Sequence, residues 1–453
     1  MTFNHRVVLA LAPVISAFVL AGQAPRQAES LLAITDVTLI DGTGTAARSH
    51  MTVTIADGRI TAVAHSETFQ PPPGAQIING TGRFAIPGLW NMHVHSLGYE
   101  QADKAFPDVL AAGIVGIRDM GAPVDEVLRL RSDTNEGRLR GPHMLVAGPL
   151  LVRGIPPSMA GTTMLSPVSS VEQASDVVVS LKKRGVDFIK VDGSLTRAVY
   201  FAVAARAKWE NMSFDGHIPA AISANEASNA GQKSIEHLGG PHHAILIACS
   251  TRESALQAEA AAMLDRQIDA AFRGENPDPA HLRAAFTKRV LGTYSEAKAT
   301  ALFGRFQKNN TWHVPTLVTL RSLWVSQGLA SEDLAYGAKI QQKQLDVVAR
   351  MWRSGVKIMA GTDGPLPQAG PALHDELALL VKAGLPPMEA LQAATRNPAE
   401  FMGRLRDVGT IEPGKVADMV VLDANPLVDI ENARRVAATI LAGTLVTTVN
   451  RQR

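Results

Sequence analysis

Four short apolar stretches of the chain each end in side chains that can bind a divalent metal ion. His93 and His95 end the stretch LWNMHVH, His217 follows MSFDG, His237 follows KSIE, and Asp363 follows VKIMAGT. Imidazole nitrogens and carboxylate oxygens are ligands that zinc accepts in proteins. Residues two apart in a strand project to the same side, so His93 and His95 can reach one ion together. The pattern predicts a metal site that could activate water for hydrolysis.

A lysine, Lys190, lies inside the apolar run VDFIKV. A buried ammonium group is costly without a partner, so one interpretation is that this side chain extends to the surface where the strand ends. The other interpretation is that CO₂ carboxylates the amine, which turns a cation into a carboxylate able to bridge two metal ions. Both interpretations stay open on the residues alone.

The segments that must position these side chains alternate between a strand-like and a helix-like sequence pattern. Across residues 84–403, short β-branched runs alternate with Ala-rich stretches of helical period, which predicts an α/β fold of the (β/α)₈, or TIM-barrel, class. Such a barrel gathers functional groups at the C-terminal ends of its strands. The candidate ligands end predicted strands one, four, five, six and eight, so the barrel would aim them at one point. The predicted strands are FAIPGLWNMHV, IVGIRDM, HMLVAG, VDFIKV, MSFDGH, KSIEHL, WHVPTLV and VKIMAGTD.

Other segments frame this barrel. Residues 31–83 and 404–453 contain short alternating β runs separated by turn residues, which is typical of β-hairpins. We expect the two segments to join as one small composite β-sandwich domain built from both chain ends. Residues 241–310 form an Ala-rich insertion of helical period, which we expect to place helices over one rim of the barrel. Further helices are predicted at EQASDVVVSLKKRG, RAVYFAVAARAKWEN, EDLAYGAKIQQKQLDVVARMWRSG and PPMEALQAATRNPAEFM.

Residues 1–24 have the pattern of a secretory signal peptide. A short segment containing Arg6 precedes an uncharged apolar run, residues 7–20, and small or polar residues follow up to Ala24. The run is shorter than the roughly 20 residues that a spanning helix needs, and it contains Pro13, so a membrane anchor is the less favoured interpretation. We expect a periplasmic or secreted protein with no membrane attachment after cleavage.

Composition excludes two other classes of protein. The chain has 44 Lys and Arg against 42 Asp and Glu, a formal net charge of +2, so no strong basic field exists to bind a nucleic acid. One cysteine, Cys249, excludes an internal disulfide and a thiolate metal site. Any metal must therefore be held by histidines and carboxylates.

Taken together, these motifs resemble the amidohydrolase superfamily of metal-dependent hydrolases. The resemblance rests on the ligand residues and on the segments AIPGLWNMHVH, GTDGP and GTIEPGKVADMVVLDANP, and it extends from about Leu31 to the C-terminus. Within the superfamily, the chain is similar to the prolidase-like branch, related to imidazolonepropionase and to ochratoxin-type amidases. The resemblance implies the barrel with its small β domain.

The same resemblance implies two divalent metal ions, with zinc expected, and a bridging N6-carboxylated lysine. It also implies that Asp363 is catalytic, since it would accept the proton of the attacking hydroxide and pass it to the leaving amine. The expected substrate is a small molecule with a C–N amide bond, either dipeptide-like or an N-acyl amino acid. The implied ligands are His93, His95 and Asp363 for one ion, His217 and His237 for the other, and Lys190 between them.

Other activities remain as alternatives. A mononuclear zinc deaminase or cyclic-amide hydrolase usually carries a glutamate three residues after the strand-five histidine, where this chain has Ala220. That departure and Lys190 favour the binuclear enzyme. A lactonase or organophosphate hydrolase is open because the same nucleophile attacks several electrophiles, and the alternative of another class is a periplasmic binding protein on an inactive barrel. The mononuclear alternative would use His93, His95, His217 and Asp363.

Three further features are weaker candidates for a role at the site. Arg153 and His313 lie near the expected mouth of the barrel, where either could contact substrate, and Arg153 would suit a carboxylate. Arg118 and Asp119 fit a structural ion pair as well as a substrate contact. Relatives are often multimers, so a homo-oligomer is compatible with the resemblance.

Overall fold

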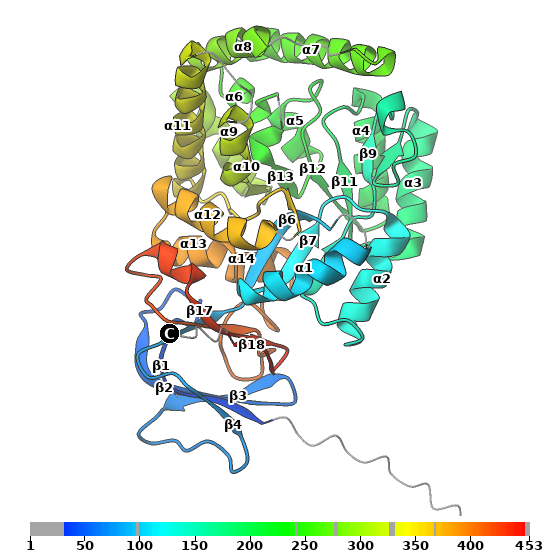
Figure 1. The fold of residues 1–453 in the computed structure, drawn as a ribbon. Coiled ribbons are helices and arrows are strands. Elements are labelled where there is room, and N and C mark those ends of the chain that lie inside the picture. Colours follow the sequence, from blue (N-terminus) through cyan, green and yellow to red (C-terminus); the bar gives the residue numbers. More distant parts are fainter. Residues whose placement is uncertain are drawn as a thin grey trace, which may run out of the picture.

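The computed structural model describes residues 31–448 except 97–98, 241, 276–279, 326–330 and 367. The expected signal peptide, residues 1–24, lies outside the described residues. No helix in these ranges is both long enough and apolar enough to cross a membrane. The described chain forms three sheets with helices packed around them (Figure 1).

The two ends of the chain meet in one mixed sheet of eight strands, at the bottom of Figure 1. Its order is β18-β17-β16-β5-β1-β2-β3, and β4 pairs with β1. The antiparallel pair β5–β16 joins the ends, with Ala85 opposite Val421. The expected sandwich is therefore one continuous sheet around a single apolar cluster. The strands are β1 (Leu32–Leu39), β2 (Arg48–Ala56), β3 (Arg59–His65), β4 (Gln76–Asn79), β5 (Phe84–Pro87), β16 (Met419–Leu422), β17 (Val436–Leu441) and β18 (Thr444–Thr448).

The middle of the chain forms two sheets of parallel strands. Their orders are β15-β6-β7-β8 and β10-β9-β11-β12-β13-β14. Most of their residues are buried, as expected of parallel strands covered on both faces. Predicted strands one to seven correspond to β6, β7, β8, β11, β12, β13 and β14, whereas β9 and β10 were not predicted. The bounds are β6 (Leu89–His95), β7 (Ile114–Asp119), β8 (His143–Val146), β9 (Leu150–Val152), β10 (Leu165–Pro167), β11 (Phe188–Val191), β12 (Ser213–Gly216), β13 (Ser234–Glu236), β14 (Trp312–Val314) and β15 (Gly364–Pro365).

Backbone hydrogen bonds outside the ladders connect the edges of these two sheets, directly between β8 and β11 and, between β14 and β6, through residues 356–363. Asp187 N donates to Val146 O at 2.8 Å beside β8, and on the other side of the array Met92 N donates to Ala360 O at 2.9 Å. The result is an α/β fold in which helices surround parallel strands. A closed eight-stranded barrel stays a prediction.

The prediction of an eighth strand at residues 356–363 is wrong. The segment makes one isolated bridge to β14, and its backbone hydrogen bonds are divided between β14 and β6, so no continuous ladder forms: Met359 N donates to His313 O and Met92 N to Ala360 O, both at 2.9 Å. Asn91 on β6 accepts a hydrogen bond from Thr362 N at 3.2 Å and donates one to Thr362 Oγ1 at 2.9 Å. Gly361 passes so close to β6 that a Cβ atom there would lie 2.8 Å from Cβ of His93. This contact brings the end of the segment against β6.

Three of the four predicted helices are present, as α3 (Val171–Arg184), α4 (Arg197–Trp209) and α11 (Ser331–Arg353). The fourth prediction, a single helix over residues 386–402, is wrong. It is two helices, because Pro398 has no N–H for the carbonyl of residue 394 and its ring would clash with that carbonyl. The remaining helices are α1 (Tyr99–Ala111), α2 (Val124–Asn135), α5 (Ala224–Asn229), α10 (Leu317–Val325), α12 (Ala369–Lys382), α13 (Pro387–Ala393) and α14 (Arg396–Phe401).

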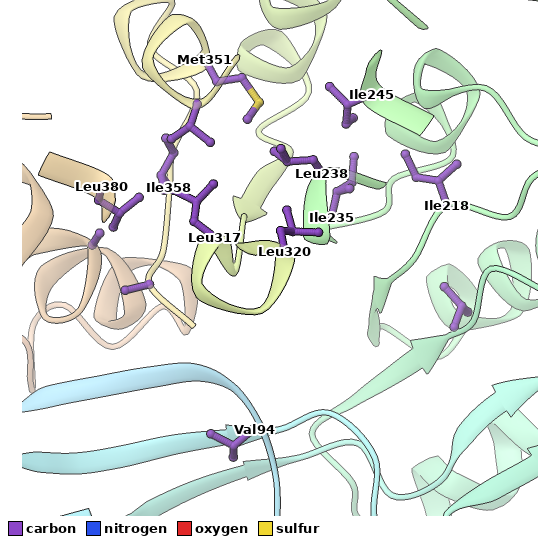
Figure 2. Close-up of a cluster of buried hydrophobic side chains, with 14 of the residues drawn as sticks. Val94, Ile218, Ile235, Leu238, Ile245, Leu317, Leu320, Met351, Ile358 and Leu380 are labelled. Carbon is purple, nitrogen blue, oxygen red and sulfur yellow. The ribbon is translucent and has the colours of Figure 1, made fainter. Parts of the chain in front are cut away.

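The insertion at residues 241–310 is helical in its described part. It contains α6 (Ala244–Ala248), α7 (Glu253–Arg273), α8 (Ala280–Gly292) and α9 (Glu296–Lys308). Helices α7 and α8 run across the top of the molecule, at the end opposite the composite sheet (Figure 1). Helix α9 instead buries Phe303 and Phe306 in the main apolar core, part of which is drawn in Figure 2.

His143 connects the parallel strands to the composite sheet. Its Nε2 lies 3.1 Å from Oδ2 of Asp418, just before β16, and its ring stacks on Trp90 at 11°. Burial opposes protonation of His143, but the charge and hydrogen bond of Asp418 outweigh burial and raise the pKa of His143. The protonated pair therefore fastens β8 to the composite sheet.

Replacing His143 by Gln should lower the free energy of unfolding by about 1 to 2 kcal/mol below pH ~6.5. A histidine whose pKa rises on folding stabilises the fold below its unfolded pKa, and this contribution is lost as pH rises through the folded pKa. Urea unfolding of both proteins near pH 6 and near pH 9 measures the effect. A difference that is equal at both pH values would contradict the ion pair.

Candidate metal centre

The structure brings the predicted histidine and aspartate ligands to one place. His93 and His95 lie on β6, His217 follows β12, His237 follows β13, and Asp363 precedes β15. Ligand atoms of His93, His237 and Asp363 all lie within 4.8 Å of one another. Nε2 of His95 lies 3.3 Å from Oδ1 of Asp363, and the rings of His217 and His237 have centroids 5.1 Å apart.

Backbone geometry aims two of these side chains inward. His237 and Asp363 both have positive φ, 52° and 53°, a region that non-glycine residues rarely occupy. His237 directly follows β13, and Asp363 directly precedes β15. Strain of this kind persists only where the surroundings hold it, and it is concentrated at functional sites.

His93 is oriented by a buried carboxylate. Its Nδ1 lies 2.8 Å from Oε2 of Glu236, and Arg118 contacts the other oxygen of Glu236 at 2.8 Å. Burial would raise the pKa of Glu236, but the charge of Arg118 and the hydrogen bond from His93 hold it well below its usual range. An ionised carboxylate only accepts hydrogen bonds, so Nδ1 of His93 carries the proton and its Nε2 presents a lone pair.

The other three histidines have Nδ1 engaged in the same way. Nδ1 of His95 lies 3.1 Å from the carbonyl oxygen of Gly121, which can only accept. Nδ1 of His217 lies 3.0 Å from Oδ2 of Asp192. Burial would raise the pKa of Asp192, but the hydrogen bond and charge of His217 hold it well below its usual range. Nδ1 of His237 lies 2.5 Å from Oγ1 of Thr316. Anchoring of one ring nitrogen fixes the orientation of the other, as in metal-binding histidines generally.

Asp363 faces the free nitrogens of three of these rings. Its Oδ1 lies 3.2 Å from Nε2 of His93 and 3.3 Å from Nε2 of His95, and its Oδ2 lies 3.6 Å from Nε2 of His237. Burial lowers the pKa of His93 and of His237, so both rings are neutral and lone pairs face a carboxylate. The hydrogen bond of Asp363 raises the pKa of His95 against the effect of burial. Opposed acceptors of this kind fit a cation between them, so the residues suit a divalent metal.

Lys190 lies on β11 and is 1% exposed. Its Nζ has no hydrogen-bond partner within the described ranges, and burial lowers its pKa although Glu236 and Asp363 favour the charged form. Gly216 on β12 leaves room for the side chain, since a Cβ atom there would lie 2.9 Å from Cδ of Lys190. Lys190 is therefore inside the protein and does not extend to the surface.

The sequence did not single out Glu236, Asp192 or Thr316 as partners of the ligands. Glu236 and Asp192 could have been suspected, because each is an acidic residue in or next to an apolar strand and within two residues of a predicted ligand. Thr316 gave no such indication. Only the fold shows that Thr316 lies against His237, 79 residues earlier.

Arg118 does not pair with Asp119, so that interpretation is wrong. Successive residues of β7 point to opposite sides. Arg118 is fully buried and donates to Met92 O, Ser234 Oγ and Glu236 Oε1. Asp119 instead accepts hydrogen bonds from Ser96 N and Gly121 N. Arg118 therefore holds Glu236, the partner of the candidate ligand His93, from within the protein.

Arg153 and His313 do not join the cluster of ligands. The guanidinium of Arg153 contacts Asp265 on α7 at 2.5 Å, so it ties the loop after β9 to the insertion. His313 is fully buried and its ring contacts that of Phe306 of α9 in a tilted arrangement, with ring centroids 4.6 Å apart. Its two neighbours in β14 pack in a different apolar cluster from Phe306, so His313 faces the helix layer and the interpretation of a substrate contact is wrong.

Replacing His313 by Leu should raise the free energy of unfolding by about 1 to 3 kcal/mol. Both ring nitrogens of His313 are buried without a hydrogen-bond partner among the described residues, and burial lowers its pKa to about 3, so a neutral polar ring is desolvated without compensation. Urea unfolding measures the gain, and zinc stoichiometry should be unchanged. A less stable variant, or one that binds less zinc, would contradict this placement.

Comparisons with known proteins agree with the geometry. Residues 84–446 match the model of the Amidohydrolase family. The structure resembles that of a putative prolidase from Bifidobacterium longum, with 26% identity, 94% of this chain and 96% of that chain covered, and a TM-score of 0.69. It also resembles a Xaa-Pro dipeptidase with bound methionine, with 21% identity, 92% and 99% covered, and a TM-score of 0.68. The second likeness concerns the fold alone.

Similarity to curated sequences points to deaminases. The 5'-deoxyadenosine deaminase of Methanothermobacter thermautotrophicus is 25% identical over 413 residues, which cover 87% of this chain and 85% of that protein. The match to a 5-methylthioadenosine/S-adenosylhomocysteine deaminase of Caldanaerobacter subterraneus is 34% identical over 87 residues, which cover 17% of this chain. This chain spans only 20% of that relative's length in the match, and 8% of an adenine deaminase from Carboxydothermus hydrogenoformans.

The family match covers most of the chain, so the protein belongs to the Amidohydrolase family. It is a hydrolytic enzyme of this metal-dependent family that acts on C–N bonds.

Proposed function

We propose that this protein is a binuclear metal-dependent hydrolase that cleaves the amide bond of a dipeptide-like or N-acyl amino acid substrate. Zinc is the proposed metal, and Lys190 is proposed to be N6-carboxylated. The proposal includes action outside the cytoplasm, on the strength of the pattern in residues 1–24.

One observation carries the proposal: Nε2 lone pairs of His93 and His237 face the carboxylate of Asp363, while the amine of Lys190 is buried nearby without a hydrogen-bond partner among the described residues. A buried, uncharged amine can react with CO₂ to give a carbamate, whose two oxygens would serve as ligands. His217 lies beside His237 but is absent from the tightest group of ligand atoms. A second ion on the side of His217 and His237 gives both histidines a role.

Two divalent ions, when bound, would lower the pKa of a water molecule and polarise the scissile carbonyl group. Asp363 accepts the proton of the attacking water at a carboxylate oxygen and delivers it to the leaving nitrogen, because an amine anion leaves poorly. Glu236 and Arg118 keep the ring of His93 in one orientation through this transfer. Asp192 does the same for His217.

The substrate class is supported by the structural relatives. The putative prolidase is at 26% identity over nearly the whole chain.

A mononuclear deaminase is the second candidate, because the 5'-deoxyadenosine deaminase matches over 87% of this chain. Ala220 speaks against it. This residue is three positions after His217 and is nearly fully buried, and its methyl group cannot move a proton. The buried Lys190 also has no part in a mononuclear site.

Metal analysis combined with substrate screening tests the proposal. Zinc-loaded protein is assayed with dipeptides, N-acyl amino acids, lactones and deoxyadenosine-type nucleosides at one metal concentration. We expect two zinc ions per chain and turnover of amides, and Lys190→Met should lower the count to about one ion because the bridge is lost. One ion per chain with ammonia released from the nucleoside would overturn the proposal in favour of the deaminase.

A further inference from the structure

The turn between β14 and α10 holds a threonine in a strained conformation. Thr316 is fully buried with φ at 46°, which is costly for a β-branched side chain. In this conformation its Oγ1 lies 2.5 Å from Nδ1 of His237. Something in the surroundings must hold Thr316 there.

Helix α10, which begins one residue later, is packed tightly between other elements. Leu317 and Leu320 lie in one apolar cluster with Leu380 of α12, Ile358 and Met351 (Figure 2). In the same turn, the hydroxyl of Thr319 donates to the carbonyl oxygen of Thr362, next to Asp363, at 2.5 Å. The first turn of α10 therefore contacts both a metal ligand and the residue beside another.

A buried carboxyl group holds this turn from the far side. Glu376 of α12 is fully buried, and its Oε2 accepts a hydrogen bond from Val318 N at 2.8 Å. This N–H group lies in the first turn of α10 and has no partner within that helix. Oε1 of Glu376 has no hydrogen-bond partner among the described residues.

Glu376 is an unusual residue for its position. Leu373, Leu377 and Leu380 on the same helix are all buried, so the helix face is otherwise apolar. A buried carboxyl group costs stability relative to a leucine, and burial raises the pKa of Glu376 to about 8. The group is therefore uncharged near neutral pH and works as a hydrogen-bond acceptor. A costly acceptor in an apolar core indicates a function other than packing.

We propose that Glu376 is a positioning residue of the metal centre. Its carboxyl group holds the first turn of α10, and this turn holds the imidazole of His237 through the hydroxyl of Thr316. The effect reaches His237 through two hydrogen bonds, Val318 N to Glu376 and Thr316 to His237, joined by the backbone of the turn, and Glu376 has no hydrogen bond to a candidate ligand among the described residues. The proposal rests on the metal-binding part of the proposed function and is independent of the substrate.

Zinc affinity of the full-length protein tests the proposal without any substrate. Metal-free protein is titrated with zinc against a chromogenic chelator, which gives the dissociation constants and the stoichiometry. The variants are Glu376→Gln, Glu376→Leu, Thr316→Val and the double variant Glu376→Leu/Thr316→Val. Leu373→Ala is the matched control, because Leu373 lies on the same helix and is equally buried. Thermal unfolding of each protein confirms that it is folded.

Glu376→Gln should bind zinc within about twofold of the unchanged protein, because an amide oxygen still accepts from Val318 N. Glu376→Leu and Thr316→Val should each weaken the zinc site formed by His237 by about tenfold, as loss of a ligand's supporting partner does elsewhere. The double variant should be no weaker than the single ones, because both act through one path. Leu373→Ala should melt earlier with unchanged zinc affinity.

Several results would overturn the proposal. Unchanged zinc affinity in a folded Glu376→Leu protein would assign Glu376 to stability alone. Losses that add in the double variant would show that Glu376 and Thr316 act separately. A tenfold loss in Glu376→Gln would show that an acceptor is not enough. These outcomes can be interpreted even if the protein does not hydrolyse amides, because the titration measures zinc affinity and uses no substrate.

Discussion

Lone pairs of imidazole nitrogens facing a carboxylate are the constraint on which the rest of this site depends. Asp363 approaches Nε2 of the neutral rings of His93 and His237 at 3.2 and 3.6 Å. Acceptors repel one another at such distances unless a cation lies between them. Each ring is prevented from rotating away because its Nδ1 is engaged by a carboxylate or a hydroxyl. The partners of Nδ1, which are not candidate ligands themselves, thus hold each Nε2 in a position suited to a metal ion.

Those supporting groups are part of the core, so the site and the fold cannot be separated. Arg118 is completely buried, bonds to Glu236 and Ser234, and lies over the rings of Phe188 and Phe401. Replacing one partner of such a buried pair leaves a charge without compensation, which destabilises proteins strongly. The buried pair of Arg118 and Glu236 therefore orients the ring of His93. Burying these charges costs free energy of folding, which the surrounding apolar packing must offset.

Local pattern was enough to predict where the candidate ligands lie and most of the strands around them. The four histidines and Asp363 could be found because each ends an apolar run, and seven predicted strands coincide with observed ones. The eighth failed because a contact between Gly361 and β6, distant in sequence, decides its shape. The predicted substrate contact of His313 failed for a related reason. The alternation of side chains in a strand places His313 on the opposite face of β14 from Trp312 and Val314, but it does not show which face of the strand packs against the helices. Partners such as Thr316 depend on tertiary contacts that no local pattern contains.

The central claim is that these residues hold two metal ions bridged by a modified lysine. Crystals of the zinc-loaded protein, measured on both sides of the zinc absorption edge, test it most directly. The account predicts two anomalous peaks, one beside His93 and one beside His217, with electron density for a carboxylate on Nζ of Lys190 between them. A single peak with an unmodified Lys190 would contradict it.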